Sequence, residues 1–266
     1  MEYVSLDDLF IRGVNNLDDL YFLNHYKDYS TNGEPIHVKY KFDPFLVQTI
    51  RDIYPDFPSD KSEEFKYLVD IRKWVNKQLY IPDVAQLEQY DQLNWNTLSV
   101  LKKMSHTPFA CDCGTYSMVL TEILLSLGYK AKWVQCLPMD LRFEDCHTVV
   151  QVFVGSLNKW IILDPAFNCC YFDGRGTVLN LAELRTLIQM RARIMIPQCP
   201  SERKTLLLEY WTKNIFRFRG LDNYCFNFMS HPKTYLYLHP RNFCVKDKSY
   251  EKEAHLYFYD EKMFWE

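Results

Sequence analysis

The sequence contains neither a basic start followed by a long apolar run nor an uncharged stretch long enough to span a bilayer. Its first apolar stretch is interrupted by Asp7 and Asp8, which is not typical of a secretory signal. It also lacks an excess of basic residues, since the net charge is -3 and the pI is near 6.2. Such a chain has no general attraction to nucleic acid or to anionic membranes. We therefore expect a cytoplasmic protein with neither nucleic acid nor membrane as a partner.

Cysteine pairs with the spacing of a structural zinc site are also missing. The chain has nine cysteines, and in a reducing compartment we expect free thiols and not a disulfide framework. Structural zinc sites favour cysteines separated by about two to four residues. Here Cys111 and Cys113 have a single residue between them, and Cys169 and Cys170 are adjacent. We expect no cofactor, although a zinc-binding cluster stays as an alternative of a different class. Such a cluster would use Cys111, Cys113, Cys146, His147, Cys169 and Cys170.

The composition is that of a folded globular protein, with 48% hydrophobic and 24% charged residues. Short apolar runs broken by turn signals predict an irregular N-terminal extension over residues 1–60, packed on the domain that follows. Residues 61–190 are predicted to form the core, and residues 191–266 a helix and strand extension of the same domain. No repeat, low-complexity segment or sharp composition shift marks a second domain.

Hydrophobic periodicity predicts the secondary structure. Apolar residues recur at three and four residue steps from Phe65 to Leu79, which predicts a helix that ends before Pro82. A helix is also predicted from about Cys113 to Leu127, with Gly128 as its C-terminal cap. The other predicted elements are helices over 95–104, 181–188 and 206–216, and strands over 131–137, 147–154, 160–163, 235–238 and 256–259.

The turn between two of these strands predicts which residues pair. A two-residue turn with Gly155 first places Val154 opposite Leu157, and counting outward brings His147 opposite Asp164. Directly paired residues have Cβ atoms about 4.5–5.5 Å apart, a separation that suits a hydrogen bond between imidazole and carboxylate. A longer loop shifts this register by a residue or two. The pattern therefore supports the pairing of the two side chains without proving it.

Three residues have the chemistry of a thiol nucleophile and its assistants. A helix N-terminus favours the thiolate form of a cysteine, which is the placement predicted for Cys113. His147 can take the thiol proton and later deliver it to a leaving amine, while Asp164 holds the imidazole ring in the right tautomer. The backbone N–H of Cys113 is a candidate donor to a developing oxyanion, and a side chain of Trp95 or Asn96 is the candidate for a second.

The order and spacing of these residues resemble the transglutaminase-like superfamily. In that family a nucleophilic cysteine opens a helix, a histidine begins a later strand, and an aspartate precedes a proline after the next strand. Cys113, His147 and Asp164 match those positions one for one. Cys111 departs from the pattern, because it stands two residues before the matched cysteine. The resemblance is found in Cys113–Ser117, Leu124–Ala131, His147–Val154 and Trp160–Pro165, and covers roughly residues 68–187.

This resemblance implies a papain-related α+β fold, with the cysteine helix packed on an antiparallel sheet that holds the histidine and aspartate. It implies acyl transfer from an amide or thioester bond through a thioester acyl-enzyme, with a peptide, a protein or an acyl thioester as substrate. We favour hydrolysis, because excluding water from an acyl-enzyme requires a specialised tunnel. An amide-forming enzyme with an amine acceptor, as in natural-product assembly, is the first alternative. An inactive peptide- or protein-binding module is the second. The acyl donor, the pathway and the oligomeric state have no signal in the sequence.

Overall fold

The structure is a computed structural model, and it describes residues 3–4, 17–29, 37–80, 96–139, 146–197, 199, 201–243, 255–258 and 264–265. Its helices are α2 (Leu17–His25), α3 (Phe45–Ile53), α4 (Glu64–Leu79), α5 (Thr97–His106), α6 (Cys113–Ser126), α7 (Leu181–Gln189) and α8 (Ser201–Asn214), with short 3-10 turns at Gly155–Leu157 and Phe228–Ser230. Its strands are β1 (Tyr3–Val4), β2 (Lys39–Tyr40), β3 (Ala131–Leu137), β4 (His147–Val154), β5 (Lys159–Leu163), β6 (Phe172–Asp173), β7 (Ile194–Met195), β8 (Arg217–Leu221), β9 (Asn223–Tyr224), β10 (Tyr235–Leu238) and β11 (His255–Phe258).

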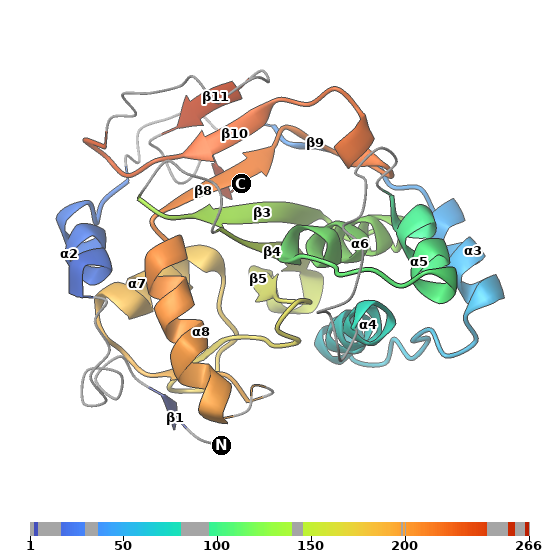
Figure 1. The fold of residues 1–266 in the computed structure, drawn as a ribbon, viewed down its shortest axis with the longest axis horizontal. Coiled ribbons are helices and arrows are strands. Elements are labelled where there is room, and N and C mark those ends of the chain that lie inside the picture. The colour runs from blue at the N-terminus through green and yellow to red at the C-terminus, as the bar shows by residue number, and fades with distance from the viewer. Residues whose placement is uncertain are drawn as a thin grey trace.

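A central sheet with the strand order β11-β10-β8-β3-β4-β5 separates two helical layers (Figure 1). Its neighbouring strands are antiparallel, except that β10 and β11 pair in parallel. Helices α3 to α6 lie on one side of the sheet, and α2, α7 and α8 lie on the other (Figure 1). The predicted α+β class is therefore confirmed.

Alternation along the strands sends side chains into two separate cores. On β3, Trp133 faces the core that contains α6, whereas its neighbour Val134 faces the core that contains α8. Strands β3 and β4 are buried on both faces along almost their whole length. Strands covered on both faces are apolar at nearly every position, which is why these segments give a strong sequence signal.

Helix α6 forms the centre of the first core. Every residue from Thr115 to Ser126 is buried, as expected for a helix that is apolar on nearly all sides. Its start is fixed by Asp112, whose carboxylate accepts a 2.7 Å hydrogen bond from the Thr115 N–H. Its end is closed by Gly128, which has a left-handed φ of +90° and donates to the Leu125 carbonyl. The predicted start and cap of this helix are both confirmed.

The predicted irregular structure of residues 1–60 is wrong in the described part, which contains helices α2 and α3. Leu46, Val47 and Ile50 form a buried face of α3, and the Val47 N–H donates to the Ser126 hydroxyl of α6 at 2.9 Å. Helix α3 is short and Pro44 occupies its N-cap, so that the segment reads as a turn in the sequence. The boundaries at residues 60 and 190 remain predictions, although β8 and β10 extend the same sheet as β3.

The predicted two-residue turn between β4 and β5 is also wrong. Val154 pairs with Lys159, because residues 155–157 form a 3-10 turn and Asn158 adopts a left-handed φ of 47°. Asparagine tolerates this conformation better than most residues, and the longer loop moves the register by two positions. Asp164 directly follows β5, and in the observed register it lies diagonally across from His147 on the same face of the sheet.

The other predicted elements agree with the structure more closely. The strands predicted over 131–137 and 147–154 match β3 and β4, and the helix predicted from Phe65 matches α4. Helix α8 begins at Ser201 and not near residue 206 as predicted, and it ends before β8 begins at Arg217.

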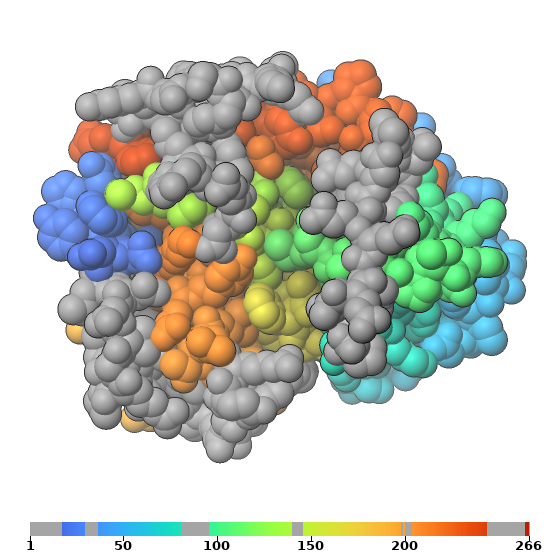
Figure 2. Space-filling view, in the orientation of Figure 1, coloured from blue at the N-terminus to red at the C-terminus, as the bar shows by residue number. Residues whose placement is uncertain are grey.

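On the face shown in Figure 2, the surface near residues 150–170, yellow on the colour bar, is visible between α8 and the green helices.

A buried carboxylate joins helices α5 and α6 to the chain before β10. Glu122 of α6 is 1% exposed, and its two oxygens accept hydrogen bonds of 2.8 Å from the N–H groups of Thr97 and Asn227. Burial raises the pKa of Glu122 to about 7 despite these two bonds, because desolvation penalises the charged form.

This raised pKa predicts a stability that falls as pH rises. The folded protein holds the Glu122 proton more tightly than the unfolded chain, whose ordinary pKa is 4.5. The contribution of Glu122 to the free energy of unfolding should therefore be greatest below pH 4.5. It should fall by about 3 kcal/mol as the pH rises to 7. Urea unfolding of the wild type and Glu122→Gln across this range measures the effect, since the variant lacks the titrating group. A constant difference between the two proteins across the range would contradict the prediction.

Candidate active site

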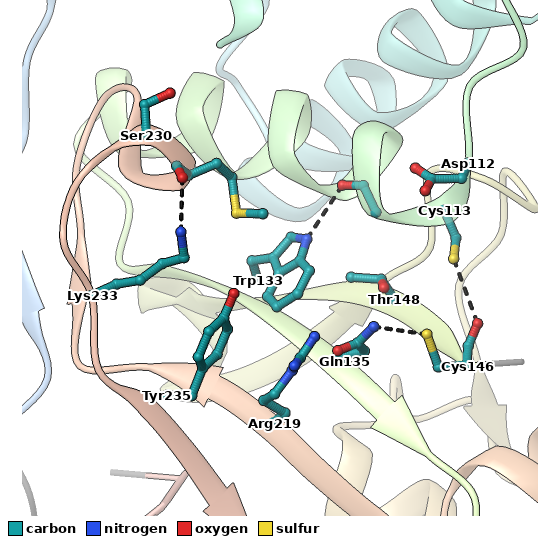
Figure 3. A pocket seen from close by; sticks show the side chains of 12 residues that line it. Asp112, Cys113, Trp133, Gln135, Cys146, Thr148, Arg219, Ser230, Lys233 and Tyr235 are labelled. Carbon is teal, nitrogen blue, oxygen red and sulfur yellow. Dashed lines mark hydrogen bonds between the residues drawn. The ribbon is translucent and has the colours of Figure 1, made fainter. Parts of the chain in front are cut away.

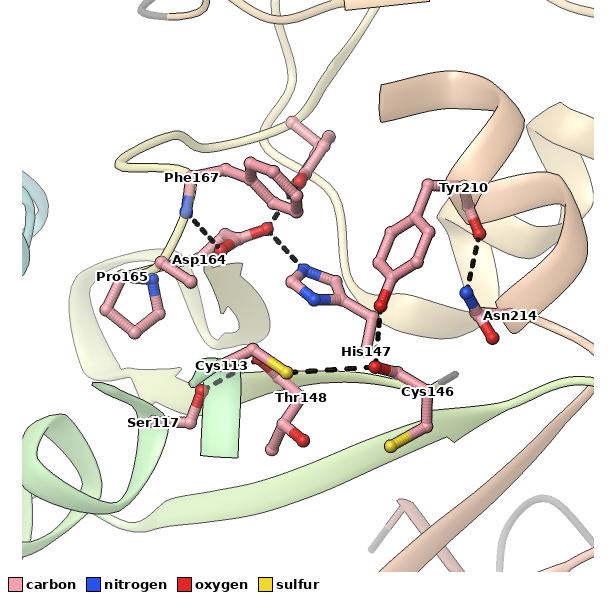
Figure 4. Close-up of polar contacts among 12 residues, drawn as sticks. Cys113, Ser117, Cys146, His147, Thr148, Asp164, Pro165, Phe167, Tyr210 and Asn214 are labelled. Carbon is pink, nitrogen blue, oxygen red and sulfur yellow. Dashed lines mark hydrogen bonds and ion pairs between the residues drawn. The ribbon is translucent and has the colours of Figure 1, made fainter. Parts of the chain in front are cut away.

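Cys113 is the first residue of α6, as the sequence predicts, and its side chain is half-buried. Its Sγ atom lies 3.7 Å from the carbonyl oxygen of Cys146, the residue directly before β4. The thiol therefore lies at the point where the N-terminus of α6 meets the start of β4 (Figure 4). This end of the helix has a partial positive charge, and Asp112 pairs with one of its N–H groups.

Two hydrogen bonds hold the first turns of α6 on the sheet. The indole N–H of Trp133 on β3 donates to the Gly114 carbonyl at 3.3 Å. The Ser117 hydroxyl donates to the Thr148 carbonyl on β4 at 2.8 Å. These bonds join the helix to both central strands directly after Cys113, so that the thiol position is set by the sheet and not by a loop.

His147 opens β4 and contacts Asp164 directly. The ring Nε2 lies 2.8 Å from the Asp164 Oδ2, and both side chains are almost completely buried (Figure 4). A carboxylate only accepts hydrogen bonds, so Nε2 must donate and Nδ1 is left for the Cys113 side. Cys113 is one of the groups that raise the His147 pKa, so its thiol lies near the ring. The structure thus brings together the three residues that the sequence singles out.

A short loop after β5 fixes the Asp164 carboxylate. Its backbone exchanges two hydrogen bonds with Cys169, and its Oδ1 accepts from the Phe167 N–H at 3.0 Å. Its Oδ2 accepts a 2.7 Å hydrogen bond from the Tyr171 hydroxyl in addition to the one from His147. Every described contact of this carboxylate is with a donor, which is the condition for keeping a buried anion.

The pKa of His147 is set by opposing effects. Burial disfavours the charged ring, but the Asp164 carboxylate, its hydrogen bond to the ring and the nearby Cys113 thiol outweigh burial and raise the pKa above its ordinary value. The ring therefore favours its imidazolium form at neutral pH. An imidazolium beside a cysteine stabilises the thiolate of that cysteine.

Aromatic side chains enclose the His147 ring on the α8 side. The ring centroids of Phe167, Tyr210 and Trp211 lie 5.0, 5.4 and 5.1 Å from the imidazole centroid. The Tyr210 hydroxyl also donates to the Cys146 carbonyl at 2.6 Å, which holds the chain just before His147. These contacts restrict the imidazole to the plane in which it meets Asp164. Sequence reasoning missed Tyr210 and Trp211, because only tertiary packing brings α8 to this site.

The two neighbouring thiols have a different environment from Cys113. Burial raises the pKa of the Cys111 thiol to about 12 and that of the Cys146 thiol to about 11. Cys111 contacts the Met104 sulfur at 3.8 Å, away from the imidazole, and Cys146 accepts a hydrogen bond from the Gln135 amide. Neither thiol is among the groups that shift the His147 pKa.

Part of the chain has the sequence pattern of a known family. Residues 53–165 match the family model of the transglutaminase-like superfamily. The resemblance stated above on the motifs around Cys113, His147 and Asp164 is therefore confirmed. The match supports a thiol enzyme in the general sense, while it leaves the reaction and the substrate undetermined.

The other comparisons are weaker. A solved structure of a candidate cysteine protease from Cytophaga hutchinsonii aligns with 13% identity and a TM-score of 0.31. The alignment covers 59% of this chain, which spans only 44% of that one. A likeness at this TM-score supports no conclusion. None of the curated proteins matches this sequence.

The second oxyanion donor predicted within the transglutaminase-like segment remains a prediction. Trp95 lies outside the described residues. Asn96 caps α5, where its side-chain oxygen accepts from the Ser99 N–H at 3.0 Å. The next residue, Thr97, bonds Glu122 in the later part of α6. Asn96 is therefore engaged in capping α5, and the described hydrogen bonds include none between it and Cys113.

A pocket of about 390 Å³ opens beside the thiol, on the face of the sheet that α6 covers. Its floor includes Gln135 and Arg219, which extend from paired positions on β3 and β8, and Lys233 lies at its far side. Sequence reasoning missed these residues. A glutamine inside an otherwise apolar strand is the one signal available, whereas Arg219 and Lys233 lie beyond the transglutaminase-like segment.

Two further observations concern metals and membranes. In the part of the chain that the structure describes, no three His, Cys, Asp or Glu side chains are arranged to hold a metal ion. None of the described helices has the length and apolar character that crossing a bilayer requires.

The buried pair predicts how His147 titrates. Asp164→Asn removes the charge that raises the His147 pKa and leaves burial to lower it, so the pKa should fall by about 1–3 pH units. Tyr171→Phe is the matched control, because it removes one hydrogen bond from Asp164 and keeps the charge. NMR titration of the imidazole, assigned with His147→Gln, measures both variants. An unchanged titration in Asp164→Asn would show that the carboxylate does not control this ring.

Proposed function

We propose that this protein is a thiol hydrolase that cleaves an amide bond of a peptide or protein, or a related acyl bond, through a covalent acyl-enzyme. Cys113 is the nucleophile, His147 the base and acid, and Asp164 the residue that orients the ring. The observation that supports this proposal is the 2.8 Å contact between His147 Nε2 and Asp164, which leaves the other ring nitrogen for the thiol at the start of α6. The family match agrees with this chemistry.

The proposed reaction has two steps. The Cys113 thiolate attacks the acyl carbon, a C–S bond forms, and the C–N bond breaks as His147 gives its proton to the leaving amine. Water then attacks the thioester, transfers a proton to His147, and the C–S bond breaks to release a carboxylic acid. The backbone N–H of Cys113 is a donor for the oxyanion of both steps, and Trp95 and Asn96 remain the candidates for the second donor.

The character of the pocket supports water as the acyl acceptor. Its described lining includes the polar side chains of Gln135, Thr148 and Ser230 beside charged residues. Polar walls of this kind do not drive water out of the site, so water still reaches the thioester of a bound acyl group. Transfer to an amine in preference to water requires a site that excludes water from the intermediate. An amine acceptor, an acyl-thioester donor and natural-product assembly thus remain the alternatives.

The proposal predicts that Cys113 is the most reactive thiol. Iodoacetamide at pH 6 should label Cys113 before Cys111 and Cys146, whose pKa values burial raises. His147→Ala should slow the labelling of Cys113 by about tenfold or more, because the imidazolium partner is lost. Mass mapping of every cysteine over time measures this order. If Cys113 reacts no faster than its neighbours, a buried structural thiol or an inactive binding module becomes the better reading.

Turnover tests the assignment directly. A library of peptide aminomethylcoumarin amides reports amide cleavage, and Cys113→Ala should lower any observed activity by about 100-fold or more. Cys111→Ala is the matched control, since it removes a thiol two residues away and should retain activity. Added hydroxylamine measures the preference between the acceptors, because an amine-transferring enzyme forms mainly the hydroxamate and a hydrolase mainly the acid. Equal activity in Cys113→Ala and the wild type would overturn the proposal.

A further inference from the structure

The pocket beside Cys113 has opposite charges at its two ends. Cys113 and Asp112 lie at one end, while Arg219, Tyr235 and Lys233 lie towards the other (Figure 3). Asp112 is the one carboxylate among the described lining residues, and its Oδ1 already accepts two hydrogen bonds from Thr115. The far end of the pocket is therefore cationic.

Contacts with aromatic rings fix both cations. The Arg219 guanidinium lies 4.5 Å from the Tyr235 ring centroid and donates to the Tyr237 hydroxyl at 3.3 Å. The Lys233 ammonium lies 5.9 Å from the same Tyr235 ring and donates to the Met229 carbonyl at 2.8 Å. Stacking of this kind orients a guanidinium before any ligand arrives, which lowers the entropy cost of binding an anion.

Arg219 and Lys233 are both half-buried, which strengthens their electrostatic attraction for an anionic ligand. Among the described residues, no carboxylate lies within ion-pair distance of the Lys233 ammonium. The Arg219 charge also reaches the Cys146 thiol, whose pKa it lowers against the larger effect of burial. Cys146 in turn is the residue whose carbonyl contacts the Cys113 thiol. The Arg219 charge therefore acts on the residue that contacts the Cys113 thiol.

The sheet register gives the distance that a ligand must span. Arg219 pairs with Gln135, and Gln135 pairs with Thr148, so these three side chains form one row across β8, β3 and β4 on the α6 face. Two strand spacings amount to roughly 10 Å. The thiol lies near the β4 end of this row. An acyl group with an anionic substituent several bonds from its carbonyl carbon reaches from one end to the other.

The position of His147 decides which part of a substrate occupies this pocket. The histidine must reach the leaving group to protonate it, so the leaving group lies on the His147 side of the thiol. His147 is packed against α8, on the other face of the sheet, and does not line the pocket. The pocket therefore receives the acyl portion, which stays on Cys113 in the covalent intermediate.

We propose that the acyl donor carries a carboxylate that binds between Arg219 and Lys233 while its carbonyl carbon is attacked by Cys113. This inference rests on the proposed function and specifies the substrate class. Arginine binds carboxylates through paired hydrogen bonds, and a lysine beside it adds a second positive charge. The carboxylate belongs to an acidic side chain or to a chain terminus, and these two sources are distinguished by experiment.

Matched alkylating probes test the inference without any turnover. N-iodoacetyl-glutamic acid α-amide is compared with N-iodoacetyl-glutamine α-amide, which has the same size and no charge. N-iodoacetyl-glycylglycine is compared with its amide in the same way and represents a chain terminus. The labelling rate of Cys113 is divided by the rate of each probe with free cysteine, which corrects for intrinsic reactivity.

We expect the acidic member of one probe pair to label Cys113 about tenfold or more faster than its neutral twin. The pair that shows this difference identifies whether the carboxylate comes from a side chain or from a chain terminus. Lys233→Gln and Arg219→Gln should each reduce this ratio, and Lys233→Glu should reverse it, because the changed residue then repels the anion. Lys102→Gln, a change at an exposed position of α5, is the control that should leave the ratio unchanged. Thermal unfolding verifies that each variant is folded.

The two proposals fail in different ways. If Cys113 is the fastest thiol but labels equally with charged and neutral twins in the wild type, the anion site is wrong and the thiol enzyme stands. The same conclusion follows if the preference persists in folded Lys233→Gln and Arg219→Gln. If Cys113 is slow with all four probes, the nucleophile is wrong, and the acyl-donor inference falls with it.

Discussion

The rest of the site depends on one buried ionic contact, that between His147 and Asp164. A carboxylate with no exposure to solvent is tolerated only when donors surround it, and Asp164 receives them from the imidazole, from Tyr171 and from the loop N–H of Phe167. Each donor comes from a segment whose own position is fixed by packing. The carboxylate therefore sets the tautomer of the ring, and the aromatic contact with Trp211 sets its plane. A change to any of these neighbours acts on the thiol through the imidazole.

The chemistry lies where the two helical layers meet the end of the central strands. The proposed nucleophile comes from α6 in one core, while the imidazole packs on α8 in the other core. Helix α6 is enclosed by protein along nearly its whole length, so its first turn has little freedom to move relative to β3 and β4. This rigidity gives the thiol a constant position against the histidine.

The central elements could be predicted from the sequence because they are buried on every side and therefore show uninterrupted apolar patterns. The residues at their ends could be singled out because chemistry and spacing agree there, and the structure brings His147 and Asp164 together. The register between β4 and β5 could not be predicted, since it depends on the left-handed backbone of Asn158. Nor could Tyr210 or Arg219, because each reaches the site through packing between distant segments, for which periodicity contains no information. The roles of the site residues stay predictions until chemistry tests them.

The strand order of the sheet has a consequence for the newborn chain. Strand β3 pairs with β4, which follows it closely, and with β8, which the ribosome supplies only after β5, α7 and α8. Until then β3 has an open edge of unpaired N–H and C=O groups, and such edges favour pairing with other chains. The thiol on α6 has emerged by this time, yet the strand with Arg219 that lines its pocket has not. A nascent chain thus has the proposed nucleophile before any of the pocket wall opposite it, and the arrival of β8 closes the edge of β3 and begins that wall, which the later residues Lys233 and Tyr235 complete.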